Sequence, residues 1–201
     1  FGKPAWERGY GCLARALDGE PLSPLLTIDE RTHDGLGAPF DALGFTRPDS
    51  VRLFVGGRPV EPLVSARSAR EFDVPGNGAS DWEHPQSLYV HGGDLPEDEV
   101  LEALGDGLWV SDLHYLNFSD HGAGSVTGLT RFACFRVEGG RIMGPIPVMR
   151  FDDSAFSLLG TSLERLTDTP RLHPETRSYD GRSSRSVRCP GALVGGLRLT
   201  L

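Results

Sequence analysis

The sequence is poor in cysteine and has no long apolar run. Its three cysteines, Cys12, Cys134 and Cys189, are widely scattered and form no Cys-x-x-Cys pair, which argues against a disulfide framework and favours a reducing compartment. No apolar stretch approaches the roughly 20 residues that span a bilayer, and the first residues lack the basic and then apolar pattern of a secretion signal. We therefore expect a cytoplasmic protein without a membrane partner.

Basic residues are also in short supply. There are 20 Lys and Arg residues against 28 Asp and Glu residues, which gives a formal net charge of −8. Such a surface repels a phosphate backbone on average, so nucleic acid is not expected as a direct partner. The stretch 171–188 is an exception with five arginines, but Tyr179 is its only aromatic residue. A solvated segment is therefore the favoured interpretation of that stretch.

The six histidines lack the spacing of a hydrolytic zinc site. Such sites usually take two histidines from one helical turn with a carboxylate beside them, and no His-x-x-x-His pair occurs here. His84 and His91 are seven positions apart with Pro85 between them. Ser111 and Ser119 are possible nucleophiles, but neither lies in a Gly-x-Ser-x-Gly turn. The chain alone is therefore not expected to hold a complete catalytic site or a cofactor.

Glycine and proline, by contrast, are abundant. They supply 26 and 15 of the 201 residues, with no collagen-like period. This composition is typical of many tight turns between short strands. We expect an α+β fold that is predominantly antiparallel β, either a sandwich or barrel-like, with one or two short packed helices.

Two segments share one hairpin pattern, in which Gly56-Gly57 and Gly139-Gly140 each separate two apolar runs. A Gly-Gly pair supplies the positive φ angles that a two-residue hairpin turn needs. The flanking strands are predicted at 51–55, 58–64, 132–138 and 141–148.

The remaining elements follow from length, periodicity and turn residues. The clearest helix is predicted at 97–104, because Pro96 suits a first turn, acidic residues crowd its start and Gly105 can end it. The other predictions are strands at 22–28, 107–118 and 193–201, a second short helix at 153–159, and loops at 33–50 and 119–128. The polar stretch between Ser162 and Val187 has no predicted strand.

Several polar residues gather around the predicted strand 107–118. Asp112 and His114 are two positions apart and share one face of that strand, and Asp120-His121 opens the glycine-rich segment after it. Satisfied hydrogen bonding is the more common role for such residues, and contact with a ligand is the alternative. The run Gly122-Ala-Gly-Ser-Val-Thr-Gly lacks a Gly-Lys-Ser/Thr ending, so we interpret it as a mobile loop that contacts an extended ligand rather than a phosphate.

Cys189 allows two interpretations. Arg188 beside it makes an electropositive setting that could favour the thiolate. A free cysteine is more often a small, buried and inert apolar group.

An ordered series of short motifs runs from about Leu22 to the end of the chain. In the first half the motifs are Leu22-Ser-Pro-Leu-Leu-Thr-Ile-Asp, Gly35-Leu-Gly-Ala-Pro-Phe-Asp-Ala-Leu-Gly, Ser65-Ala-Arg-Ser-Ala-Arg and Gly76-Asn-Gly. In the second half they are Gly107-Leu-Trp-Val, Gly128-Leu-Thr-Arg, Val137-Glu-Gly-Gly-Arg-Ile, Gly144-Pro-Ile, Arg150-Phe and Cys189-Pro-Gly. This series resembles the C-terminal domain of the TldD/TldE (PmbA, modulator of DNA gyrase) metallopeptidase family and is closer to TldE/PmbA.

The resemblance implies a role in the proteolysis of peptides. In that family a TldD subunit holds zinc through a His-Glu-x-x-x-His helix and a late cysteine, and it pairs with a TldE subunit. Cys189 matches the region of that cysteine and is our candidate metal ligand, with zinc expected only in the complete complex. Since the sequence begins with Phe1, we expect 1–21 to lead in from an upstream domain and 22–201 to form the β-rich C-terminal domain. The candidate substrate-binding residues are Asp112, His114, His121 and Thr130.

Three functions remain open. The chain could belong to a non-catalytic, TldE-like subunit that forms the substrate cleft, or to an active zinc peptidase whose zinc helix lies upstream. It could also be an unrelated β-rich binding module. The expected partners are a TldD-like catalytic subunit or a homodimer partner, together with an extended peptide. Since the strand 108–118 contains no proline, we expect it and the loop 119–128 to face that peptide or partner, where a peptide can add as an extra strand.

Overall fold

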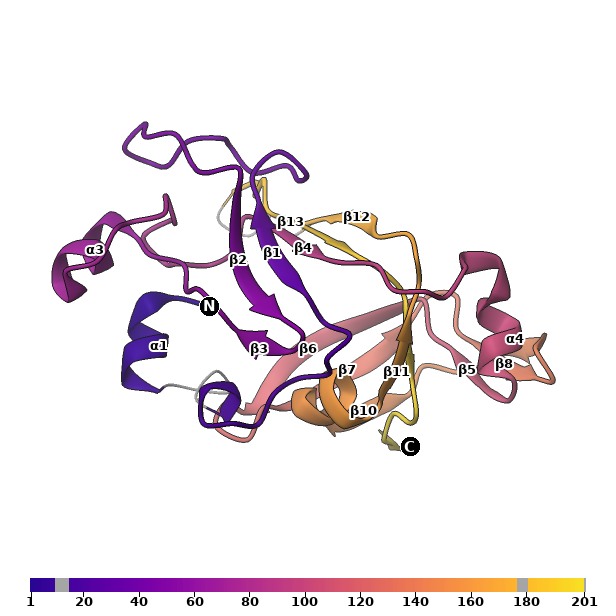
Figure 1. Ribbon diagram of the computed structural model, residues 1–201. Coiled ribbons are helices and arrows are strands. Elements are labelled where there is room, and N and C mark those ends of the chain that lie inside the picture. The colour runs from indigo at the N-terminus through magenta and orange to yellow at the C-terminus, as the bar shows by residue number, and fades with distance from the viewer. Residues whose placement is uncertain (10–14, 177–180, 201) are drawn as a thin grey trace. The chain divides into compact units, whose positions relative to one another are not determined.

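The computed structural model describes residues 1–9, 15–176 and 181–200 (Figure 1). The chain forms two compact units. Unit one comprises Phe1–Gly92 with Pro170–Pro190, and unit two comprises Gly93–Thr169 with Gly191–Leu201. Antiparallel strands dominate and the helices are short, which confirms the expected α+β class, and no sheet of the described residues closes into a barrel.

Unit one is built on a sheet with the strand order β12-β13-β4-β1-β2-β3. Its strands are β1 (Ile28–Arg31), β2 (Ser50–Val55), β3 (Arg58–Pro59), β4 (Ser87–Val90), β12 (Arg171–Pro174) and β13 (Ser186–Cys189). Neighbouring strands are antiparallel, except that β13 runs parallel to β4. Unit one also contains helices α1 (Lys3–Arg8) and α3 (Ala66–Phe72), and Ser65 caps α3 by accepting a hydrogen bond from Ser68 N. The buried apolar side chains include Leu26, Ile28, Val51, Leu53, Phe54, Leu63 and Val64.

Unit two contains three small antiparallel sheets, with the orders β15-β10-β7-β6, β5-β8-β9 and β11-β14. Its strands are β5 (Gly107–Trp109), β6 (Asp112–Asp120), β7 (Ser125–Arg131), β8 (Phe135–Glu138), β9 (Arg141–Pro145), β10 (Arg150–Ser154), β11 (Leu163–Leu166), β14 (Ala192–Val194) and β15 (Leu199–Thr200). The helical segments are η1 (Glu97–Glu99), α4 (Val100–Leu104) and η2 (Ser157–Thr161). The buried apolar side chains include Leu95, Cys134, Val137, Phe151, Leu163 and Leu166.

Both predicted Gly-Gly hairpins are confirmed. Gly56 and Gly57 have φ angles of 53° and 74°, and Gly139 and Gly140 have 53° and 73°, so all four adopt the left-handed conformation that the turn requires. The predicted helix at 97–104 is also confirmed, as η1 followed by α4, and Gly105 ends it with a φ angle of 61°.

The predicted strand at 22–28 is wrong. Ser23 O accepts a hydrogen bond from Leu26 N, which closes a turn around Pro24, and the strand begins only at Ile28. It then includes Asp29 and Glu30, the two residues that the sequence pattern placed at its end. Both carboxylates are buried, and pairing with cationic side chains makes that possible.

The single long strand predicted at 107–118 is also wrong. It is interrupted at Val110 and Ser111, because β5 pairs with β8 while β6 pairs with β7 in a different sheet. The loop predicted at 119–128 is mostly strand, since β6 continues to Asp120, β7 begins at Ser125 and the turn occupies only 121–124.

The last third of the chain contains more strand than its polarity suggested. The stretch between Ser162 and Val187 includes β11 and β12, and β12 is an edge strand, a position where polar side chains are normal. The predicted final strand is two short strands, β14 and β15. The second short helix is present but shifted, because 150–154 extend as β10 and the helical turn η2 begins at Ser157.

Candidate functional site

The β6–β7 hairpin of unit two carries the candidate site. β6 is the outermost strand of its sheet in the order β15-β10-β7-β6, so its second side pairs with no strand among the described residues. An unpaired strand edge presents a row of free N–H and C=O groups to any extended chain that approaches it. The nine residues of β6 make this a long edge, and they include no proline.

Exposed apolar side chains line this edge. The exposed fractions of Tyr115, Leu116 and Phe118 are 71%, 52% and 46%. The register slips between His114 and Asn117, where three steps on β6 oppose two steps on β7, so β6 contains a bulge. Tyr115 lies in the bulge with a φ angle of 52°, which is rare for a bulky residue and persists only where the surroundings fix it.

Asp112 and His114 lie together at the start of β6, as the sequence predicted. In register Asp112 is opposite Arg131 and His114 is opposite Leu129, so His114 and Arg131 are diagonal neighbours across the hairpin. Arg131 Nη1 lies 2.7 Å from His114 Nε2 and 2.9 Å from His114 Nδ1. The structure therefore brings an arginine, which the sequence analysis did not select, against a predicted histidine.

The other two candidates differ in position, since Thr130 is opposite Leu113 in the paired part of the same hairpin and His121 is not. Thr130 is 1% exposed, and its hydroxyl accepts a hydrogen bond from Met149 N at 2.9 Å, so its side chain has a structural role in this fold. His121 lies in the turn at the far end of the hairpin, where its ring packs 4.9 Å from that of Phe118. It is seven positions from His114, which corresponds to roughly 20 Å along a strand.

Gly128 marks a close approach inside β7. A Cβ atom at this position would lie 2.7 Å from Phe151 Cε1 and 3.0 Å from His114 O. Phe151 is fully buried, so its ring cannot move aside. Glycine is therefore required here for close packing against the ring and against the bulged strand.

Cys189 lies on β13 in unit one, with Arg171 as its register partner on β12. Burial raises the pKa of its thiol, which disfavours the thiolate. Arg188 directs its Nε–H to Asp34 O at 3.1 Å. The inert interpretation therefore fits the isolated chain better than the activated one.

The described parts of the chain do not offer a complete metal site. No group of three or more His, Cys, Asp and Glu side chains among them is arranged to hold a metal ion. A ligand role for Cys189 would need ligands from outside these residues, so we assign no chemical step to a metal. No helix among the described residues is long and apolar enough to cross a membrane.

A second polar cluster lies in the sheet of unit one and was missed by the sequence analysis. Asp29 is fully buried, and its two oxygens lie 2.5 Å from Arg52 Nε and 2.8 Å from His91 Nε2. Arg31 Nε lies 3.1 Å from the same carboxylate. These partners compensate the buried carboxylate charge of Asp29, so we assign the cluster a structural role. No local signal reveals it, because the partners come from three strand regions.

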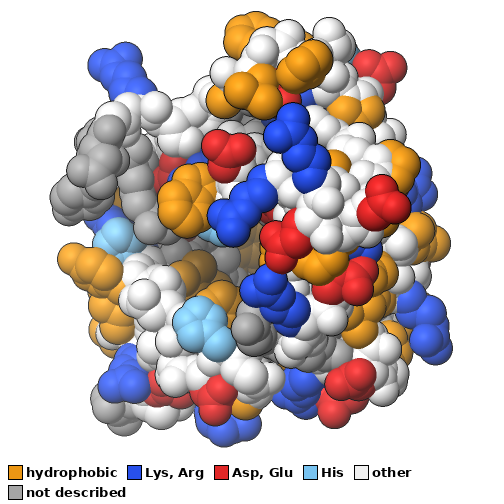
Figure 2. Space-filling model, turned by 90° about the vertical axis from the view of Figure 1, so that its left-hand side faces the viewer, with side chains coloured by type: hydrophobic (Ala, Val, Ile, Leu, Met, Phe, Trp, Pro, Cys, Tyr) orange, Lys and Arg blue, Asp and Glu red, His pale blue; other side chains and the backbone are white. Residues whose placement is uncertain are grey.

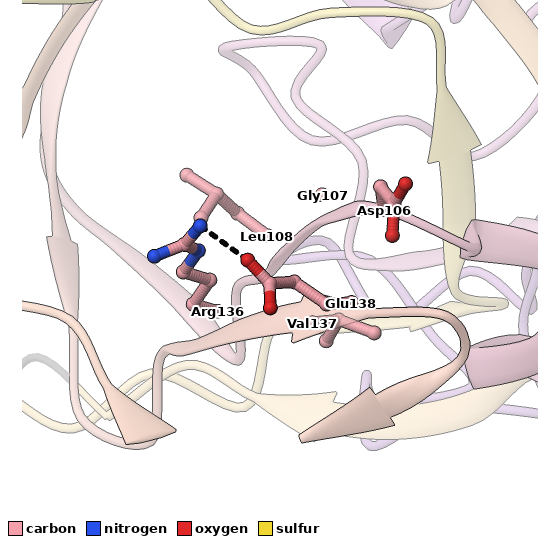
Figure 3. Close-up of a pocket in the computed structure, with 6 residues that line it drawn as sticks. All are labelled: Asp106, Gly107, Leu108, Arg136, Val137 and Glu138. Carbon is pink, nitrogen blue, oxygen red and sulfur yellow. Dashed lines mark ion pairs between the residues drawn. The ribbon is translucent and has the colours of Figure 1, made fainter. Parts of the chain in front are cut away.

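A hollow beside β5 and β8 is a weaker candidate. Its lining residues are Asp106, Gly107, Leu108, Arg136, Val137 and Glu138 (Figure 3). Arg136 and Glu138 form an ion pair, and Asp106 Oδ1 accepts a hydrogen bond from Gly139 N at 2.7 Å. Its charged groups therefore already have protein partners.

Among the described residues, the face of the molecule seen in Figure 2 has no single-sign patch of charge, because acidic and basic side chains are interspersed there among apolar ones.

Comparisons with known proteins agree with the resemblance seen in the sequence. Residues 3–201 match the family model described as the PmbA/TldA metallopeptidase C-terminal domain. No curated protein matches the chain.

Solved structures share the fold. TldE from Thermococcus kodakarensis superposes with a TM-score of 0.80 at 14% identity, over 100% of this chain and 45% of that chain. A proposed modulator of a DNA gyrase from Thermotoga maritima gives 0.77 at 16% identity, over 98% and 44%. A proposed modulator of DNA gyrase from Bacteroides thetaiotaomicron gives 0.70 at 19% identity, over 99% and 42%. The chain thus spans less than half the length of each of these proteins.

Proposed function

Because the chain belongs to the PmbA/TldD metallopeptidase family as its C-terminal domain, we propose that it serves in the proteolysis of peptides as the non-catalytic, TldE-like half of a cytoplasmic two-subunit complex. In this proposal a TldD-like partner supplies the zinc centre, and the present chain forms part of the cleft that holds the peptide. Likeness to TldE in fold and the position of the candidate site support the proposal.

The unpaired edge of β6 is the observation that carries it. An extended peptide can add to such an edge, gaining main-chain hydrogen bonds for affinity and side-chain contacts for selectivity. Tyr115, Leu116 and Phe118 offer apolar contacts along the strand. Substrates that have lost their own fold expose backbone and apolar side chains together, which is the combination this edge accepts.

A charge placed on the edge tests the proposal. Phe118→Lys should reduce peptide binding and turnover by the complete gene product with its partner by at least tenfold, because a cation replaces an apolar contact of about 2 kcal/mol. Thermal stability should change little, since Phe118 is 46% exposed. Met143→Lys is the matched control, because Met143 is 59% exposed and lies on β9 in another sheet. Equal activity of the two variants would refute a role for this edge.

A further inference from the structure

The geometry points to Arg131 as a subsite for a carboxylate of the peptide that adds to β6. This inference deepens the proposed function and rests on it. Arg131 is the last residue of β7 and is paired with Asp112, the first residue of the edge strand β6.

The backbone of Arg131 is held firmly. Its carbonyl oxygen accepts hydrogen bonds from Ser111 Oγ at 3.2 Å and from Cys134 Sγ at 3.1 Å. The next residue, Phe132, has a φ angle of 60°, so the chain turns sharply after Arg131. The base of the arginine side chain is thereby fixed relative to β6.

The guanidinium group is held as well. His114 contacts Nη1, and the ring of Phe132 lies 4.5 Å from the guanidinium carbon. Nη1 lies near both ring nitrogens, and because a guanidinium group has only donors, the nitrogen that carries no hydrogen must be the acceptor. An arginine held between two rings has already lost much of its side-chain freedom, which lowers the entropic cost of binding a ligand.

Within the described residues, the charge of Arg131 is nevertheless not neutralised. No carboxylate forms an ion pair with it among the residues described in the two units, and none of their acceptors contacts its Nε or Nη2. Asp112 is its register partner, yet it lies outside ion-pair distance. Two adjacent N–H donors in one plane match the two oxygens of a carboxylate.

The flanking aromatic residues mark the same place. Tyr115 and Phe132 are 71% and 73% exposed, both have left-handed backbones, and the ring of Tyr115 lies 4.3 Å from that of His114. A peptide lying along β6 would therefore meet a cation bordered by two apolar rings. The C-terminal carboxylate of a peptide and an acidic side chain both have the chemistry that this cation recognises.

The test measures the binding of three hexapeptides to the complete gene product with its partner, and the peptides share one apolar sequence except for a single Glu in the third. One has a free C-terminal carboxylate, one has a C-terminal amide, and one is the amide with an internal Glu. We expect either carboxylate peptide to bind about tenfold or more tightly than the plain amide, because charge-assisted hydrogen bonds are the stronger class. The free acid and the Glu peptide separate the two sources of the carboxylate.

Arg131→Gln should abolish this preference, so that the three peptides bind with equal affinity. Arg141→Gln, which removes an exposed cation on β9, should retain the preference. If Arg131→Gln does not fold, Arg131→Lys replaces it, and a reduced preference is expected because the planar pair of donors is lost. Equal binding of all three peptides by the unaltered protein, or an undiminished preference in Arg131→Gln (in Arg131→Lys where the Gln variant does not fold), would overturn the subsite alone. Failure of every peptide to bind would overturn the proposed function itself.

Discussion

Arg47 and Glu30 form the most deeply buried ion pair in the described part of the chain. Their side chains are 5% and 2% exposed, and Arg47 Nη2 lies 3.0 Å from Glu30 Oε1. Glu30 also accepts hydrogen bonds from Gln86 N and Ser87 N, and Arg47 Nε donates to Gly78 O. The pair thus connects the irregular loop before β2 to the start of β4.

Removing one partner of this pair should be costly. Arg47→Met leaves the Glu30 carboxylate buried without its cation, and we expect a loss of about 3–5 kcal/mol in the free energy of unfolding. Arg165→Met is the control, because Arg165 and Asp94 are 36% and 80% exposed and such a pair contributes only about 0–1 kcal/mol. Urea unfolding of both variants measures the difference, and similar losses would contradict the assigned role.

Turn chemistry predicted the elements better than polarity did. The Gly-Gly hairpins and the helix after Pro96 follow from local residues, and both are present. The strand 107–118 was predicted as one piece because its apolar residues are continuous, whereas its division depends on which strand each half pairs with. The site shows the same limit: Asp112 and His114 follow from strand alternation, but Arg131 meets His114 only through the register of a hairpin whose bulge no local pattern reveals.

The turn at Gly56-Gly57 allows a matched test at the scale of one element. A Cβ atom on Gly57 would lie 2.1 Å from Leu22 O, whereas on Gly56 the nearest atom is Pro24 O at 3.8 Å. Both residues have positive φ angles. Gly56→Ala should therefore cost about 1 kcal/mol from its backbone conformation. Gly57→Ala should cost clearly more, because the backbone of residue 22 must also move. Thermal unfolding of the two variants measures both losses of stability. Equal losses would mean that the backbone of residue 22 can shift at little cost in free energy.

At the scale of the whole molecule, the chain enters unit two at Gly93, leaves it at Thr169 and returns at Gly191. Each unit has its own set of buried apolar side chains, so the two should open as separate cooperative regions.

Phe151→Ala removes a fully buried ring from unit two at a cost of about 3–5 kcal/mol. Amide hydrogen exchange should then accelerate in β6, β7 and β10 and remain unchanged in β1, β2 and β4. Leu53→Ala, at a position 1% exposed in unit one, should give the reverse pattern. Equal acceleration in both units in either variant would show that the chain unfolds as one cooperative body, and substitutions in one unit would then alter the stability of the β6 edge and of the β1 sheet together.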